Sequence, residues 1–204
     1  MSAILRRAAA HAAGTLCQRH TDRARADGRR GGFGFTLIEL LLVVTIVGIL
    51  ASVALPSLAR ARAISLEAST IGSMRALNSA ETSFATSCGG GSYAPTVASL
   101  ATAATGSTRA FIGPGFTADT TNRQGYQIVF TAGTLVPKAP ASCNGLAAGQ
   151  VVQSYFIDAS PLTTGNGAPT RYFGTSASAT IFQSTKRVTA FYTGVPPAPA
   201  TPIQ

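Results

Sequence analysis

Glu39 raises the first question of chemistry, because it is the one charged side chain in an apolar run that covers residues 35–55. As a helix rising about 1.5 Å per residue, such a run is long enough to cross the roughly 30 Å hydrocarbon core of a bilayer. A carboxylate at that depth costs about 3 kcal/mol or more. We therefore expect Glu39 to have a function and a positively charged partner.

The other titratable residues do not form a catalytic pattern. Both histidines, His11 and His20, lie before residue 35. From residue 35 onward the acidic residues are widely separated: Glu39, Glu67, Glu81, Asp119 and Asp158. Their spacing offers no acid–base pair, no zinc-binding cluster and no histidine-dependent nucleophile. The three glycines at residues 89–91 are not followed by the Lys-Ser/Thr of a phosphate loop. The sequence predicts no enzyme, no metal site and no cofactor.

A basic segment precedes the apolar run. Residues 1–34 hold seven arginines against two aspartates and end in Arg29-Arg30-Gly31-Gly32-Phe33-Gly34. Such a segment marks the cytoplasmic side of a membrane helix. An ordinary secretory signal would be cut after the apolar run, and Ala51-Ser52-Val53-Ala54 offers small residues for that alternative.

The residues around the start of the run resemble the class III signal of type IV prepilins and pseudopilins. The matching sequence is Gly34-Phe35-Thr36-Leu37-Ile38-Glu39, and Gly48 and Pro56 fit the same family. The resemblance implies that a prepilin peptidase cuts between Gly34 and Phe35, methylates the new amine of Phe35 and leaves the helix in place.

This resemblance also implies a function. The chain would be a structural subunit that waits in the inner membrane and is polymerised with copies of itself by an assembly ATPase and a platform protein. It would end in a surface pilus or a periplasmic pseudopilus. The partner of Glu39 would be the amine of Phe35 on a neighbouring subunit, although Phe35 of the same helix is a competitor.

The sequence predicts five segments. They are a cleaved leader at 1–34, a membrane or filament-core helix at 35–58, an amphipathic extension at 59–86, a β head at 87–190 and a proline-rich mobile tail at 191–204. The fold class is α+β, with the extension packed on an antiparallel sheet of about four strands. Strand patterns occur at residues 126–130, 151–157, 171–173 and 180–182. A long loop at 88–125 contains a short helix at 95–104.

The long helix has an apolar stripe and two weak points. Apolar side chains recur at three- and four-residue spacings: Ile64, Ala68, Ile71, Met74, Leu77 and Phe84. Gly48 and Pro56 favour flexibility, with a kink or local melting between them.

Two cysteines, Cys88 and Cys143, follow the apolar run. Export past the inner membrane would place them in an oxidising compartment, where they would form a disulfide. Two buried free thiols are the alternative.

The net charge of +9 suggests nucleic-acid binding, but more than half of it lies in the leader. The remaining cations of the head are scattered, so DNA capture by a minor pilin is possible but not favoured. A type II secretion pseudopilin is the other alternative. The major subunit of that class usually has a calcium site built from acidic residues near the C-terminus, and the scarcity of such residues here disfavours this alternative.

Overall fold

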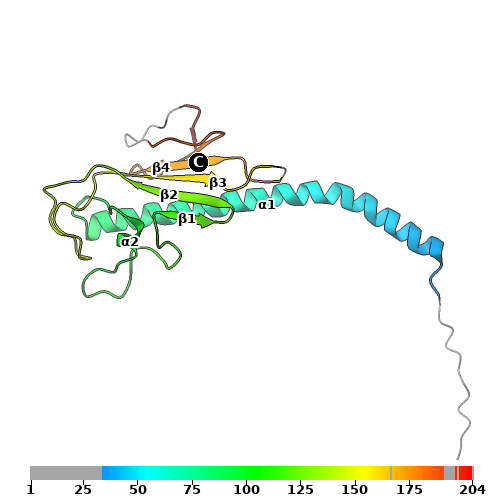
Figure 1. Ribbon diagram of the computed structural model, residues 1–204, viewed down its shortest axis with the longest axis horizontal. Helices are drawn as coiled ribbons and strands as arrows, with labels where there is room; N and C mark the ends of the chain where they lie inside the picture. The colour runs from blue at the N-terminus through cyan, green and yellow to red at the C-terminus, as the bar shows by residue number, and fades with distance from the viewer. Residues whose placement is uncertain (1–33, 166, 191–195, 197, 204) are drawn as a thin grey trace, which may run out of the picture. The chain divides into compact units, whose positions relative to one another are not determined.

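The structure is a computed structural model that describes residues 34–165, 167–190, 196 and 198–203. Its elements are α1 (Leu37–Ser87), α2 (Val97–Leu100), β1 (Thr120–Arg123), β2 (Tyr126–Ala132), β3 (Tyr155–Pro161), β4 (Tyr172–Ser176), β5 (Ile181–Ser184) and β6 (Thr201–Pro202). The chain divides into two compact units, Met1–Val43 and Val44–Gln204. In the first unit the structure describes residues 34–43, which include the start of α1. Figure 1 shows the sheet lying along the second half of α1. The fold is α+β, as the sequence predicted.

The first half of α1 leaves its apolar side chains uncovered. Leu37, Ile38, Val53, Leu55 and Leu58 each expose more than 60% of their surface. By length and composition, α1 is a helix that could cross a membrane. Because such a surface is unstable in water, it requires a bilayer or other protein.

The helix is unbroken at Gly48 and Pro56. Pro56 lies inside α1 and provides no N–H for the preceding turn. Two nearby hydroxyls bond to helix carbonyls, Ser52 Oγ to Ile49 O (2.7 Å) and Ser57 Oγ to Ala54 O (2.8 Å). The local melting expected here is therefore not present in the structure, while flexibility in the filament stays a prediction.

The second half of α1 packs against the sheet. Its buried face includes Met74, Leu77 and Phe84, which join the main hydrophobic core. Ile64 is 60% exposed and Ala68 is exposed as well, so the predicted stripe began too early. The buried face begins at Glu67, the first buried residue of the helix.

The sheet has six antiparallel strands in the order β1-β2-β3-β4-β5-β6, two more than predicted. The longest pairing joins β2 to β3, from Tyr126 opposite Pro161 to Ala132 opposite Tyr155. The sequence analysis missed β1 because its side chains are polar and half-exposed, Thr-Thr-Asn-Arg. A two-residue turn with positive φ at Gln124 (48°) and Gly125 (78°) joins it to β2, the geometry that matches strand twist in hairpins.

The second missed strand, β6, lies within the segment expected to be a mobile tail. Phe182 pairs with Pro202 and Gln183 with Thr201. The amide of Ile203 also donates to the Ile181 carbonyl at 2.9 Å. The proline-rich sequence suggested no pairing, but edge strands tolerate proline, so the described end of the chain is held by the sheet. Residues 191–195, 197 and 204 lie outside the described part.

The long loop between α1 and β1 is attached to the head at several points. It contains α2, shorter than predicted and capped by the Thr96 side chain, which accepts from the Ser99 amide at 3.2 Å. Tyr93 forms an isolated bridge with Val152. Asp119 Oδ1 accepts from the Val97 amide at 2.7 Å. These contacts hold the two ends of the loop together and attach it to the segment that precedes β3.

Candidate functional site

Glu39 lies in the first turn of α1. Its amide donates to Thr36, whose hydroxyl oxygen is 3.3 Å away and whose carbonyl oxygen is 3.1 Å away. Thr36 thereby caps the helix start. A carboxylate in the first turn is also favoured by the partial positive charge of the helix N-terminus. These effects reduce the cost of Glu39 but do not neutralise it.

Glu39 has no ion-pair partner among the described residues, where the two ion pairs belong to Arg171 and Arg187. In the uncleaved chain the nitrogen of Phe35 is an amide, so it carries no charge for Glu39 to bind. The expected pairing with an amine requires cleavage first. It stays a prediction for the processed subunit.

Nothing in the fold requires glycine at residue 34. A Cβ added to Gly34 would meet no atom within 4 Å, and the same is true of Gly48. The residue precedes α1, and Phe35 beside it is 75% exposed. A requirement for glycine at this position therefore has to come from another molecule. The remainder of the leader, residues 1–33, lies outside the described part of the chain.

Cys88 and Cys143 are joined by a disulfide in the structure. Cys88 directly follows α1, and Cys143 lies between β2 and β3. The carbonyl of Cys143 accepts from both the amide (2.8 Å) and the hydroxyl (2.9 Å) of Thr105. The bridge thus connects the end of the helix, the long loop and the β2–β3 connection.

Two carboxyls of the head form ion pairs that join different elements. Glu67 of α1 accepts from Arg171 Nε at 2.7 Å, and Arg171 also donates to Gln183 of β5. Asp158 of β3 accepts from Arg187 Nε at 3.0 Å. Burial raises the pKa of Asp158 above its ordinary value, and the neighbouring Arg187 offsets part of that rise.

Glu81 is buried without a cation. Its Oε2 accepts from the Ala94 amide at 2.9 Å, while Oε1 has no hydrogen-bond partner among the described residues. Burial raises the pKa of Glu81 to about 8, although the Ala94 hydrogen bond acts in the opposite direction. The sequence analysis did not predict that the Glu81 carboxyl is buried. The signal was the seven-residue recurrence of Glu67, Met74 and Glu81, which places all three on one face of a helix.

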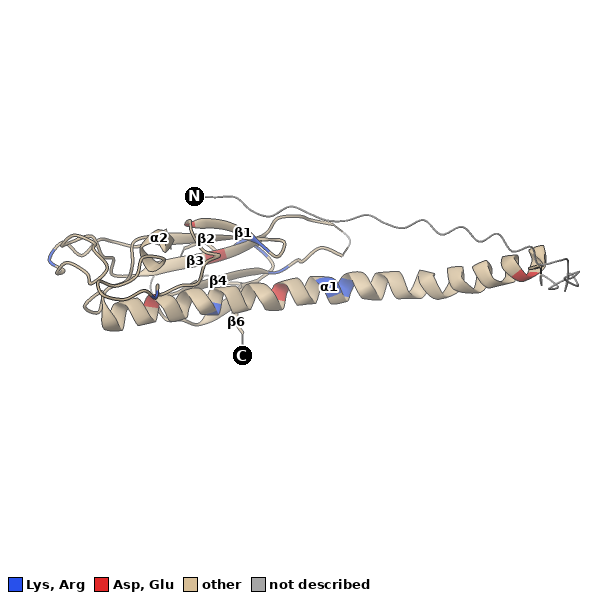
Figure 2. Cartoon of the chain, turned by 90° about the horizontal axis from the view of Figure 1, so that it is seen from below, with Lys and Arg blue, Asp and Glu red and all other residues tan. Residues whose placement is uncertain are grey.

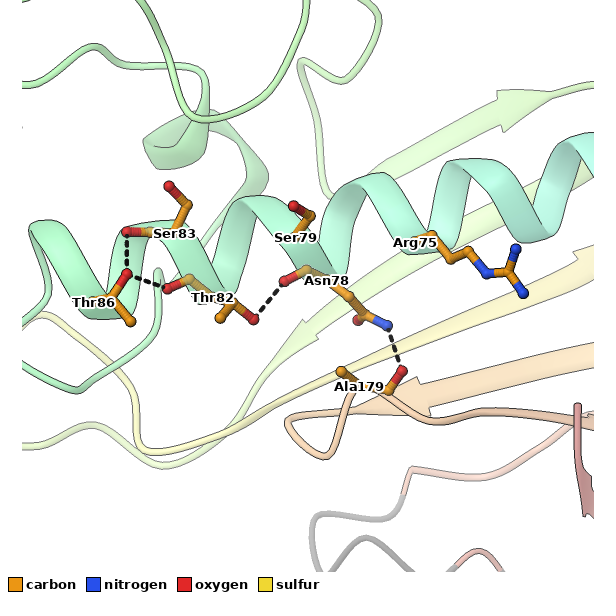
Figure 3. Close-up of a pocket in the computed structure, with 7 residues that line it drawn as sticks. All are labelled: Arg75, Asn78, Ser79, Thr82, Ser83, Thr86 and Ala179. Carbon is orange, nitrogen blue, oxygen red and sulfur yellow. Dashed lines mark hydrogen bonds between the residues drawn. The ribbon is translucent and has the colours of Figure 1, made fainter. Parts of the chain in front are cut away.

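The cavities of the head carry little catalytic chemistry. One lies on the exposed side of α1, where Asn78 points toward Ala179 and donates to its carbonyl at 3.3 Å (Figure 3). The hydroxyls of Thr82 and Thr86 bond to carbonyls of α1 itself. Arg75 is the one charged lining residue. Across the described residues, no three His, Cys, Asp or Glu side chains gather as metal ligands.

Taken together, an uncovered apolar helix with a lone carboxylate in its first turn leads into an α+β head, an arrangement that is consistent with a membrane precursor. Residues 29–55 match the prokaryotic N-terminal methylation motif, the class III signal of type IV pilins. This confirms the resemblance at residues 34–39. No curated protein and no solved structure matches the chain.

Proposed function

We propose that the chain is the precursor of a structural subunit of a type IV pilus-like filament. The observation that carries this proposal is Glu39, a carboxylate in an exposed apolar helix that has no ion-pair partner among the described residues and lies within the matched motif, a few residues after Gly34. A lone buried charge is costly, whereas a second subunit can supply the opposite charge. The function is polymerisation, and no reaction is assigned to the chain.

Processing creates that opposite charge. A prepilin peptidase cuts between Gly34 and Phe35, and the new amine of Phe35, which is then methylated, stays positively charged. It lies about one helical turn from Glu39 along the chain, and therefore within about 6 Å of it in depth. In the filament it pairs with Glu39 of a neighbour.

Assembly moves the helix from lipid to protein. The exposed side chains of residues 35–58 must leave the inner membrane together, and they stay out of water when they pack against the same residues of other subunits. A head-to-tail contact that does not close gives an open helical filament. An assembly ATPase and a platform protein supply the work. The heads then form the outer surface.

We favour a surface pilus over a secretion pseudopilus. A pseudopilin of the major type would need a cluster of acidic oxygens for calcium near the end of the chain. Asp158 is the one acidic residue after residue 119, and it is bound by Arg187.

The N-terminus of the exported protein tests the proposal. Intact-mass analysis of membrane-extracted protein should give a chain that begins at Phe35 and carries one added methyl group. In Gly34→Val the full-length precursor should persist, because a side chain at this position blocks the peptidase subsite. Gly28→Val makes the same change further upstream in the leader and should be processed normally. An identical N-terminus in wild type and Gly34→Val would remove the prepilin assignment.

A further inference from the structure

Arg60 and Arg62 are two exposed cations that directly follow the apolar part of α1. Within the unit that begins at Val44, the apolar side chains extend through Leu58, and Arg60 is the first charged residue after them. Figure 2 shows basic residues on this part of α1, next to a long uncharged stretch of the same helix. Two guanidinium groups therefore lie where a spanning helix leaves the hydrocarbon.

Neither arginine forms an ion pair with a carboxylate among the residues that the structure describes. The nearest acidic residue along the helix, Glu67, is buried and already bound by Arg171. Among the described residues, no ion pair includes Arg60 or Arg62. The described part of the chain therefore supplies no counter-charge to them.

A second copy of the head is poorly equipped to provide it. Glu81 and Asp158 are buried, and the half-buried Asp119 accepts from the Val97 amide. Glu39 is exposed, but in the sequence the rest of the apolar run lies between it and Arg60. The described head thus offers its neighbours cations without free, exposed carboxylates.

The surface next to Arg60 is suited to an amphiphile. Arg60 lines a cavity of about 570 Å³ together with Leu55, Pro56 and Ala59 of α1 and with Gly167. Apolar side chains therefore lie on one side of the guanidinium. A phospholipid presents the same order of groups, with acyl carbons below and a phosphate above.

We propose that Arg60 and Arg62 bind the phosphate groups of anionic phospholipids on the head side of the inner membrane before the subunit enters a filament. This rests on the proposed function in one respect, that residues 35–58 cross that membrane. Guanidinium groups bind phosphate through paired hydrogen bonds. After the leader and its seven arginines are removed, these two are the basic residues nearest to the span. They set its depth and must be released when the subunit is extracted.

Energy transfer from a tryptophan placed next to Arg60 tests this proposal in vesicles. The chain contains no tryptophan, so Leu58→Trp, at an exposed position, gives a single donor. The full chain is reconstituted in phosphatidylcholine vesicles with a trace of acyl-labelled phosphatidylglycerol or acyl-labelled phosphatidylcholine as acceptor. Local enrichment of the anionic lipid should be about fivefold for each arginine at low salt and should fall as salt rises.

Two double variants distinguish the contribution of Arg60 and Arg62 from that of other exposed cations. Arg60→Gln with Arg62→Gln should abolish the preference for phosphatidylglycerol, while Arg109→Gln with Lys138→Gln removes the same charge from exposed positions of the head and should retain it. Equal transfer to both lipids in the parent protein would overturn the proposal, as would loss of preference in the control variant. A preference for phosphatidylglycerol that appears only at high protein density would mean that the binding site needs a neighbouring copy of the chain. That result would also overturn the proposal.

The same reporter distinguishes this proposal from the filament function. Quenching of the introduced tryptophan by brominated phosphatidylcholine reports whether the helix inserts at all. Insertion without lipid preference overturns the headgroup assignment alone, whereas failure to insert would contradict both.

Discussion

The carboxylate of Glu39 would destabilise an isolated subunit in a membrane, whereas it could stabilise a filament by pairing with a neighbour. In a bilayer it has no ion-pair partner among the described residues, whereas in the proposed filament a neighbour's Phe35 amine would compensate it. A subunit that arrives out of register leaves both charges unpaired, at a cost of about 3 kcal/mol or more. One residue can therefore select the register of assembly.

Replacing Glu39 tests this selection. We expect Glu39→Ala to be cleaved normally, because the cut lies upstream, and to insert in the membrane at least as well as wild type. It should enter filaments poorly, as measured by immunoblotting of sheared surface filaments against the membrane fraction. Glu39→Asp, which keeps the charge, should assemble better than Glu39→Ala. Abundant filaments from Glu39→Ala as the sole subunit would refute the mechanism.

Glu81 predicts a pH dependence of head stability with a definite sign. Its pKa is raised to about 8 in the folded head, while in the unfolded chain it is close to the ordinary value of 4.5. The folded state therefore binds more protons between these values, and its free energy of unfolding falls as pH rises from about 4.5 to 8. Burial of Asp158 adds a contribution of the same sign.

Glu81→Gln should weaken that dependence. Thermal unfolding of the detergent-solubilised chain, followed by tyrosine circular dichroism, should show a smaller fall in melting temperature between pH 5 and pH 8 than wild type. At pH 8 the variant should be the more stable of the two, because it buries no charge. The residual slope would come from Asp158. Equal slopes in both proteins would mean that Glu81 is already ionised in the fold.

At the scale of elements, the disulfide connects the end of α1 to the loop between β2 and β3. Cys88 and Cys143 are 55 residues apart in sequence. On the chain-entropy treatment, closing such a loop stabilises the fold by about 4 kcal/mol. Non-reducing peptide mapping of exported protein should recover the two cysteines in one linked peptide pair. Recovery of both as free thiols would reject the bridge.

The ion pair between Glu67 and Arg171 connects α1 to the start of β4. Glu67 is buried, whereas the Arg171 side chain is 44% exposed, so Arg171→Met alone leaves a carboxylate without its cation and should destabilise the head by about 1–3 kcal/mol. Adding Glu67→Leu should recover much of that loss, since two apolar side chains can replace a buried pair. Urea unfolding of the single and double variants measures the difference. Equal losses in both would show that the contact acts by packing and not by charge.

The elements with strong periodicity could be predicted from sequence, and those defined by pairing could not. The apolar run, the four central strands and the short helix at α2 each have a local pattern. The polar β1 and the two-residue β6 have none, because their positions depend on the open edges of β2 and β5. Likewise, Gly34, Phe35 and Glu39 belong to a contiguous motif, whereas the partners of Glu67 and Asp158 come from distant parts of the chain.

At the scale of the whole molecule, the chain combines a surface that cannot remain in water with a head whose carboxyls are mostly buried. A bilayer or a polymer of such chains would cover the apolar surface, as the proposed function requires. In cells that lack the assembly ATPase, we expect processed protein that begins at Phe35 to stay in the membrane fraction. Surface filaments from cells with the complete machinery should contain the same processed chain. Processed protein released free into the medium without the ATPase would contradict this.

The order of the strands has a consequence for export. Each strand pairs with the one before it in the chain, so no strand has to wait for a distant one to emerge. If the polypeptide crosses a membrane with its anchor already inserted, as the proposed function requires, the head can grow by adding one hairpin partner at a time. Contacts between successive segments also keep the search for the folded state short. Such a sheet is suited to vectorial folding, in which the part already outside is a template for the part still arriving.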